Sequence, residues 1–260
     1  IKVKALRINL NQNIYGTFAE IGAGQETVRN FFRAGASSRT IAKAMSAYDK
    51  DFSDAIYGEE VDGRYVTESR LKKMLTHEIN LVEERLSREK HPDKLFFSYA
   101  NTVATIDFAK QNKGHGWVGI VYQLEPNEAY NEITLHIRFK ENDAKLQQET
   151  LGILGVNLIY GAFYKYNDPK KLLRYLYDHL DKDQIEVDNI NFSGPRFAEV
   201  DNRLMSLQLV KNGMTDAVMF GPDGKNILPA TVLYKKNILA LRGSFRPVTK
   251  VNMDMYEESY

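Results

Sequence analysis

Three consecutive segments in the middle of the chain alternate apolar and polar residues, and this alternation constrains the fold more than any other feature. The segments cover residues 95–108, 116–124 and 132–139 and are rich in aromatic and β-branched side chains. A repeat of two residues is typical of a half-buried β-strand. Pro126-Asn127 supplies a turn between the second and third segments. The sequence therefore predicts three neighbouring antiparallel strands.

Amphipathic helices are expected before and after these strands. Residues 67–86 carry apolar side chains at helical spacing behind a capping Thr67. Residues 145–164 form a second apolar helix, in which Gly152, Gly155 and Gly161 indicate close packing against a neighbour. These patterns predict an α/β or α+β fold with a mixed sheet, whose central antiparallel portion at about residues 95–139 is flanked by helices.

The remaining segments have weaker patterns. Residues 2–10 roughly alternate and are expected to form a strand or an extended arm, and residues 38–57 are expected to be helical with a break near 49–53. Apolar residues 237–241 predict a further strand. Other expected elements are extended segments at 15–21, 185–192 and 217–220 and helices at 25–34, from Asp168-Pro169 onward, and at 202–212.

The domain organisation follows from these elements. We expect a single α/β domain over residues 1–241, with residues 242–260 as the start of a following segment or of a truncated second domain. A chain of 260 residues is long enough to bury a substantial core.

Composition narrows the classes of function. The 35 Lys and Arg residues nearly balance the 34 Asp and Glu residues, so no overall charge attracts nucleic acid or an anionic membrane. The absence of cysteine excludes disulfides and thiolate metal sites. No apolar run is long enough to span a bilayer and no signal-peptide pattern is present. We therefore expect a cytoplasmic protein that binds neither nucleic acid nor membranes.

A metal site is not expected either. The five histidines do not form a ligand pair at helical spacing. An acidic cluster around Asp49, Asp51 and Asp54 is interpreted as a solvated helix edge, with a cation site as the alternative.

A glycine-containing turn is the first candidate ligand site. Gly22-Ala23-Gly24 follows Glu20 between a predicted strand and a predicted helix. Such a turn lets backbone amides approach a phosphate at the start of a helix. The turn also resembles the first motif of S-adenosylmethionine-dependent methyltransferases, although Glu26 or Thr27 replaces the third glycine. The alternative is a purely structural turn.

The second candidate lies near the C-terminal end of the chain. The run Gly243-Ser244-Phe245-Arg246-Pro247-Val248-Thr249-Lys250 is similar to the opening Gly-x-Phe-x-Pro-Val-x-His motif of nucleotidyltransferases that make nicotinate and pantetheine adenylyl products. The resemblance implies that Gly243, Ser244, Phe245 and Pro247 lie under the phosphates of ATP or another nucleotide. Lys250 replaces the first catalytic histidine and no second one follows. The alternative is a turn in which Pro247 starts a helix.

His115 is the third candidate. It lies between two glycines, close to the only tryptophan, Trp117, at the start of a predicted strand. An imidazole there is able to be exposed and catalytic. The alternative is a structural histidine whose hydrogen bonds are satisfied in a turn.

Taken whole, the chain resembles the N-terminal half of a bacterial family of roughly twice its length. Five stretches carry the resemblance, at residues 15–26, 46–58, 114–117, 154–159 and 201–204. Members of that family are named nicotinate-nucleotide adenylyltransferase or TonB-dependent receptor. The second name implies an outer-membrane barrel, which this composition contradicts.

These observations support three hypotheses about function. The first is a domain that frames a nucleotide-binding site completed by its own missing C-terminal half. The second is a complete nucleotide- or cofactor-dependent transferase, nucleotidyltransferase-like or methyltransferase-like, that uses the Gly22–Gly24 turn. The third is a self-associating scaffold, a homo-oligomer formed through the glycine-lined helix at 151–161.

Overall fold

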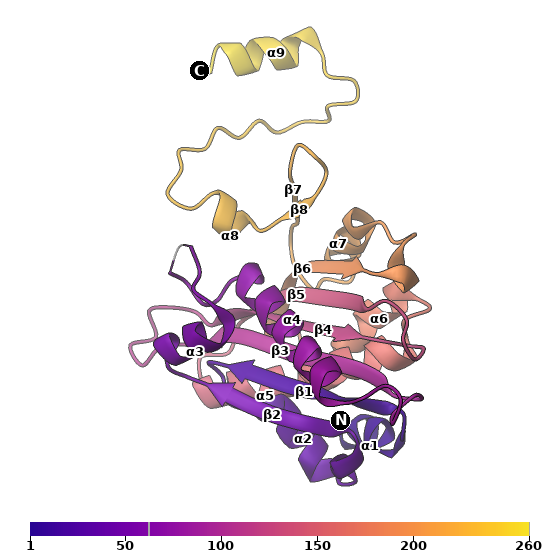
Figure 1. Cartoon of the computed structure of the whole chain (residues 1–260). Helices are drawn as coiled ribbons and strands as arrows, with labels where there is room; N and C mark the ends of the chain where they lie inside the picture. The colour runs from indigo at the N-terminus through magenta and orange to yellow at the C-terminus, as the bar shows by residue number, and fades with distance from the viewer. Residues whose placement is uncertain (62, 260) are drawn as a thin grey trace.

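The computed structural model describes residues 1–61 and 63–259, and its centre is a six-stranded mixed sheet (Figure 1). The strand order is β2-β1-β3-β4-β5-β6. β1 pairs in parallel with β2 and with β3, and all later neighbours are antiparallel. The predicted mixed sheet with an antiparallel central portion is confirmed. The strands are β1 Ile14–Ile21, β2 Ile41–Ala47, β3 Leu95–Ala104, β4 His115–Tyr122, β5 Asn131–Phe139 and β6 Ile185–Ser193.

Helices cover both faces of this sheet (Figure 1). α5 packs against α1, α2, α6 and β4 on one face, and α4 packs against β1, β3 and β4 on the other. No helix in the described ranges combines the length and apolar character needed to cross a membrane. The helices are α1 Lys2–Leu10, α2 Glu26–Ala34, α3 Lys50–Tyr57, α4 Glu68–Arg85, α5 Ala144–Tyr164, α6 Pro169–Leu176, α7 Asn202–Lys211, α8 Pro229–Val232 and α9 Lys250–Glu257.

Alternation along the central strands divides the side chains between two cores. In β4, Val118, Ile120 and Tyr122 enter the larger core under α5, whereas Trp117 and Val121 enter the smaller core under α4. The same alternation places His115 on the α4 side. A short hairpin, β7 Met219–Phe220 and β8 Asn226–Ile227, packs beside β6. His115 therefore lies at the end of β4 on the face of the sheet that α4 covers.

The predicted close packing of the glycine-containing helix is confirmed. A Cβ at Gly152 would lie 2.9 Å from the Glu26 carbonyl oxygen in α2, and a Cβ at Gly155 would overlap Thr27 and Tyr99. The glycines of α5 thus allow α2 to approach within the same molecule.

Residues 2–10 form α1, so the predicted strand is wrong. Ala5, Ile8 and Asn9 are buried at helical spacing, whereas Val3 and Leu10 are exposed. The Asn9 side chain donates hydrogen bonds to two carbonyl oxygens around the end of α2. Tertiary packing of one helical face therefore outweighs the loose alternation.

Residues 38–57 are not one interrupted helix. Their first part contains β2, which pairs in parallel with β1 at the sheet edge. Asp49 then caps α3 by accepting a hydrogen bond from the Phe52 N–H at 2.8 Å. The strand exists because β1 offers it backbone partners, which no local pattern reveals. The capping role predicted for Thr67 is confirmed, because its hydroxyl accepts the Arg70 N–H at 3.0 Å.

The strand predicted at 237–241 is also wrong. Ile238 and Leu239 are 57% and 50% exposed, and no described segment pairs with them. An apolar run without a partner strand cannot complete its backbone hydrogen bonds as a sheet. After α8 the chain leaves the packed layers and ends in α9 (Figure 1).

We predict that Gly155→Ala destabilises the fold by about 1–3 kcal/mol, because the new methyl group overlaps Thr27 and Tyr99. Gly161→Ala is the matched control in the same helix, since its Cβ would lie 3.1 Å from Leu172 and requires only a small side-chain shift. Urea denaturation of both variants measures the difference. Equal stability of the two variants would contradict this account of the α2–α5 contact.

Candidate functional site

The most promising concave site is a pocket of about 810 Å³ at the end of the sheet where β4 begins and β5 ends. We call it the His115 pocket. One wall is formed by the start of β4 with Lys113 and Gly114, a second by residues 63–68 before α4, and a third by β8 and α8. Residues from early, central and late parts of the sequence therefore meet around one space.

Cationic side chains predominate at the rim of this pocket. Four of its lining residues are cationic, namely Lys50, Arg64, Lys113 and Arg138. Among the described residues, Glu68 is the one in the lining with a carboxylate. The Lys50 ammonium pairs with Asp54 at 3.0 Å, and the Arg64 guanidinium lies 5.5 Å from the centre of the Tyr234 ring.

Lys113 and Arg138 differ from the other two cations, because neither forms an ion pair within the described residues. Both residues are exposed and line the pocket. An anion is the ligand that such a pair would attract.

Two histidines and an aspartate form a hydrogen-bonded chain in the pocket wall. His115 Nδ1 lies 3.3 Å from His136 Nε2, and His136 Nδ1 lies 2.6 Å from the Asp188 carboxylate. His136 is 2% exposed, whereas His115 is half-buried and lines the pocket. This series of hydrogen bonds therefore connects the largely buried carboxylate of Asp188 with the His115 ring at the pocket.

The sheet register explains how three residues distant in sequence meet. His115 of β4 opposes Arg138 of β5, so His136 is its diagonal neighbour on the same face. Between β5 and β6 the register shifts, and Asp188 becomes an extra residue between two paired positions. A β-bulge of this kind re-aims a side chain, here toward His136.

The neutral form of His115 is favoured. Burial is the largest cause that lowers the pKa of His115, and the charges of His136 and Arg138 lower it further. Asp188 acts in the opposite direction with a smaller effect. His115 is therefore held in its unprotonated form, which is the form that accepts a proton.

An aromatic surface adjoins this chain. Trp117 lines the pocket although it is only 6% exposed, and its ring centre lies 5.0 Å from that of His136 in an edge-on arrangement. The carboxamides of Asn189 and Asn226 are also in the lining. Asn226 attaches the third wall to the sheet, because its Nδ2 donates to the Ile190 carbonyl at 3.1 Å.

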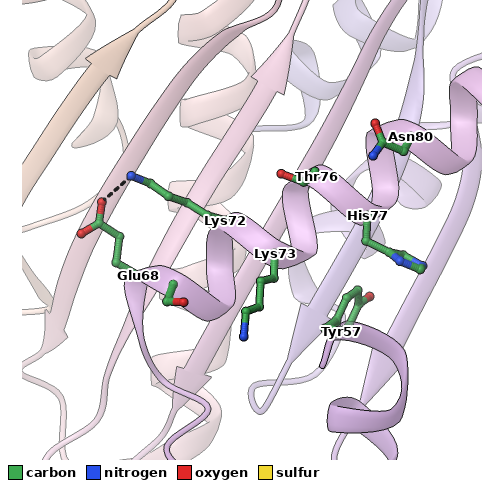
Figure 2. Close-up of a pocket in the computed structure, with 8 residues that line it drawn as sticks. Tyr57, Glu68, Lys72, Lys73, Thr76, His77 and Asn80 are labelled. Atoms are coloured by element: carbon green, nitrogen blue, oxygen red, sulfur yellow. Dashed lines mark ion pairs between the residues drawn. The ribbon is translucent and has the colours of Figure 1, made fainter. Parts of the chain in front are cut away.

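A second, more open hollow of about 700 Å³ lies along the outer side of α4 (Figure 2). Its charges already have partners: Lys72 pairs with Glu68 at 3.0 Å, and Lys73 pairs with Glu60 at 2.9 Å. His77 contacts the edge of the Tyr57 ring at the far end of this hollow (Figure 2). We therefore regard the His115 pocket as the better candidate.

The Gly22–Gly24 turn lies outside both pockets. Gly22 has a φ of 89°, and a Cβ there would overlap the Val103 carbonyl oxygen, so the turn requires glycine for packing. The buried Glu20 carboxylate accepts the Val28 and Thr27 N–H groups at 2.9 and 3.2 Å. These are amides at the start of α2 that a phosphate would otherwise bind.

The second sequence candidate also stands apart from His115. Gly243, Ser244, Phe245 and Pro247 are exposed in the irregular segment before α9, and Lys250 is the first residue of that helix. Among the three sequence candidates, only His115 lines a described pocket.

The acidic cluster near α3 has structural roles. Asp49 caps the helix, and Asp54 forms ion pairs with Lys50 and with the buried Arg70. Within residues 1–61 and 63–259, no group of three or more histidine or acidic side chains is arranged to hold a metal ion.

Comparison with known proteins adds a distant structural likeness. No family model and no curated protein matches the chain. A CinA (competence-damaged protein) superfamily protein from Enterobacter cloacae is 12% identical with a TM-score of 0.41, over 62% of this chain and 89% of that one. A CinA superfamily protein from Klebsiella pneumoniae is 11% identical with a TM-score of 0.43, over 66% and 96%. Competence/damage inducible protein CihA from Agrobacterium tumefaciens is 13% identical with a TM-score of 0.36, over 68% and 95%. A likeness this distant says nothing about ligand or activity.

Glu20 should make folding stability depend on pH. Burial raises its pKa from 4.5 to about 7, so the folded state holds this proton more tightly than the unfolded state does. The stability that Glu20 contributes is therefore fully present below about pH 4.5 and is lost as the pH rises through 7, by on the order of 3 kcal/mol.

We predict that Glu20→Gln removes this dependence, so that wild type loses stability relative to the variant between pH 4.5 and 8. Urea denaturation across that range measures the difference between the two proteins. Glu149→Gln, at an exposed position in α5, is the control and should follow wild type. A constant difference between wild type and Glu20→Gln would show that Glu20 does not titrate in this range.

Proposed function

We propose that this domain binds a nucleotide in the His115 pocket, with the phosphates at Lys113 and Arg138. The observation that carries the proposal is that two cations without ion-pair partners among the described residues meet a tryptophan and two histidines around one space. The volume of about 810 Å³ is within the range of small-molecule and cofactor sites.

The charges support a phosphate rather than a neutral ligand. Arg138 presents a planar fork of donors that matches two phosphate oxygens, and Lys113 adds a compact charge. At a protein surface, two opposite charges about 4 Å apart attract by about 4 kcal/mol. A phosphate bound between Lys113 and Arg138 would gain part of this attraction, reduced by solvent because both residues are exposed, and would not first have to break an ion pair within the described residues.

The other lining groups suit the remainder of a nucleotide. Trp117 and Tyr65 offer ring surfaces that suit a base. The carboxamides of Asn189 and Asn226 also line the space. The Nδ2 of Asn226 already donates to the carbonyl oxygens of Ile190 and Asn202, so Asn189 is the amide left to pair with a base. An amide group next to a ring surface is the combination that reads the edge of a base.

The position of the third wall connects this proposal with the C-terminal segment. Val232 lines the pocket, and Tyr234, two residues later, contacts Arg64. The run Gly243 to Lys250 follows, and it contains the exposed apolar residues Phe245 and Val248. We propose that a further C-terminal half of a longer protein would pack on this segment and complete the nucleotide site.

The alternative hypotheses have less support. The glycines of α5 pack against α2 in the same molecule, which leaves the self-associating scaffold without its motivating surface. Glu20 engages amides that a cofactor phosphate would need at the Gly22–Gly24 turn.

We predict that ATP changes the fluorescence of the protein, because its only tryptophan, Trp117, lines the proposed site. Arg138→Ala and Lys113→Ala should each weaken binding about tenfold to a hundredfold, as expected for one charge-assisted hydrogen bond. Lys145→Ala is the matched control, because this lysine side chain is 81% exposed on α5. If Arg138→Ala and Lys113→Ala bound ATP as tightly as Lys145→Ala does, the proposed site would be wrong.

A further inference from the structure

We propose that His115 is a general base that activates water for hydrolysis of a phosphoanhydride bond in the nucleotide, and that His136 and Asp188 position it. This inference rests on the proposed nucleotide site and adds an activity to it. The candidate chemistry comes from the hydrogen-bonded chain, which ends at the pocket in a single imidazole.

The hydrogen bonds between Asp188, His136 and His115 determine which ring nitrogens carry protons. An ionised Asp188 can only accept, so His136 donates from Nδ1, and in the neutral His136 ring Nε2 is then an acceptor. His115 must then donate from Nδ1 to that Nε2. The remaining nitrogen of His115, Nε2, has a free lone pair and lies on the opposite side of the ring from His136.

The surroundings of His115 favour this base form. Arg138 from β5 and Arg64 from the segment before α4 disfavour a second proton on His115, and so does His136 whenever it is itself protonated. Asp188 from β6 is the opposing charge, and the ring of His136 separates it from His115. When His115 accepts a proton, this carboxylate stabilises the resulting imidazolium through His136.

The reaction balances with water as the second substrate. The water oxygen forms a bond to the terminal phosphorus while its proton passes to His115 Nε2. The bond from that phosphorus to the bridging oxygen breaks, and the electron pair stays on the oxygen of the departing phosphate group. Lys113 and Arg138 stabilise the charge on this oxygen, and the imidazolium then returns its proton to the leaving group or to solvent.

The geometry distinguishes this role from structural support. A histidine that only stabilised the sheet would gain from burial, yet His115 is half-buried at the pocket while its partner His136 is nearly inaccessible. The bulge at Asp188 also interrupts the regular pairing of β5 and β6 at the position where the carboxylate meets His136. Interruptions of this kind are common beside active sites.

The test measures phosphate release from ATP and from ADP by the full chain, together with ATP binding by Trp117 fluorescence. Wild type should release phosphate, and His115→Gln should lower the rate by about 10²–10⁴-fold while ATP affinity changes less than about threefold. Asp188→Asn should lower the rate by a similar factor, because its amide donates to His136 and reverses both tautomers, so that His115 Nε2 carries the proton. Asp216→Asn removes one exposed carboxylate elsewhere and should leave the rate unchanged.

A second readout separates positioning from loss of structure. Nitrogen NMR of the imidazoles should show His115 protonated at Nδ1 in wild type and at Nε2 in Asp188→Asn, with thermal unfolding confirming that the variant is folded. An unprotonated Nδ1 on His115 in wild type would overturn the proposed chain.

Three outcomes are distinguishable. ATP binding without phosphate release between pH 5 and about pH 9, where an imidazole base is titrated, would overturn the hydrolytic activity and leave the nucleotide site intact. No binding of ATP or ADP would overturn both proposals. Phosphate release that His115→Gln and Asp188→Asn leave unchanged would assign the activity to another part of the chain.

Discussion

The antiparallel pairing of β5 with β4 and with β6 is the constraint on which the candidate site depends. A shift of one residue in either register would turn His136 or its partners to the opposite face of the sheet. The buried side chains of β4 and β5, such as Ile120 and Leu135, hold this register because they fill the core under α5. The apolar face of the sheet therefore positions the polar residues on the other face.

Local charge clustering explains how a nearly neutral chain presents a cationic pocket. The formal net charge is only +1, so the attraction for an anion arises from where the charges lie. Arg138 and Lys113 stay exposed at the rim, where water solvates them, whereas the carboxylate of Asp188 is placed behind His136. Cations thus outnumber Glu68, the one lining carboxylate among the described residues, at the ligand space, and Asp188 supports the two histidines from behind.

The sequence predicts the central strands and the longest helices well because they repeat with a clear period, as in residues 95–139, but the apolar run at 237–241 is not a strand. It fails at residues 2–10 and 38–57, where a buried helical face and a parallel neighbour strand decide the structure. His115 is a candidate from the sequence, because it lies between two glycines, close to Trp117, at the start of a predicted strand. Its partners His136 and Asp188 cannot be predicted from the sequence, because they meet only through strand register and a bulge. No local sequence pattern encodes the register or the bulge.

The most direct test of the nucleotide site is a crystal structure of the protein with ADP bound. We expect phosphate density between Arg138 and Lys113, with His115 facing the terminal phosphate and the base near Trp117. Phosphate density at the Gly22–Gly24 turn or along Gly243 to Lys250, with the His115 pocket containing only water, would contradict it.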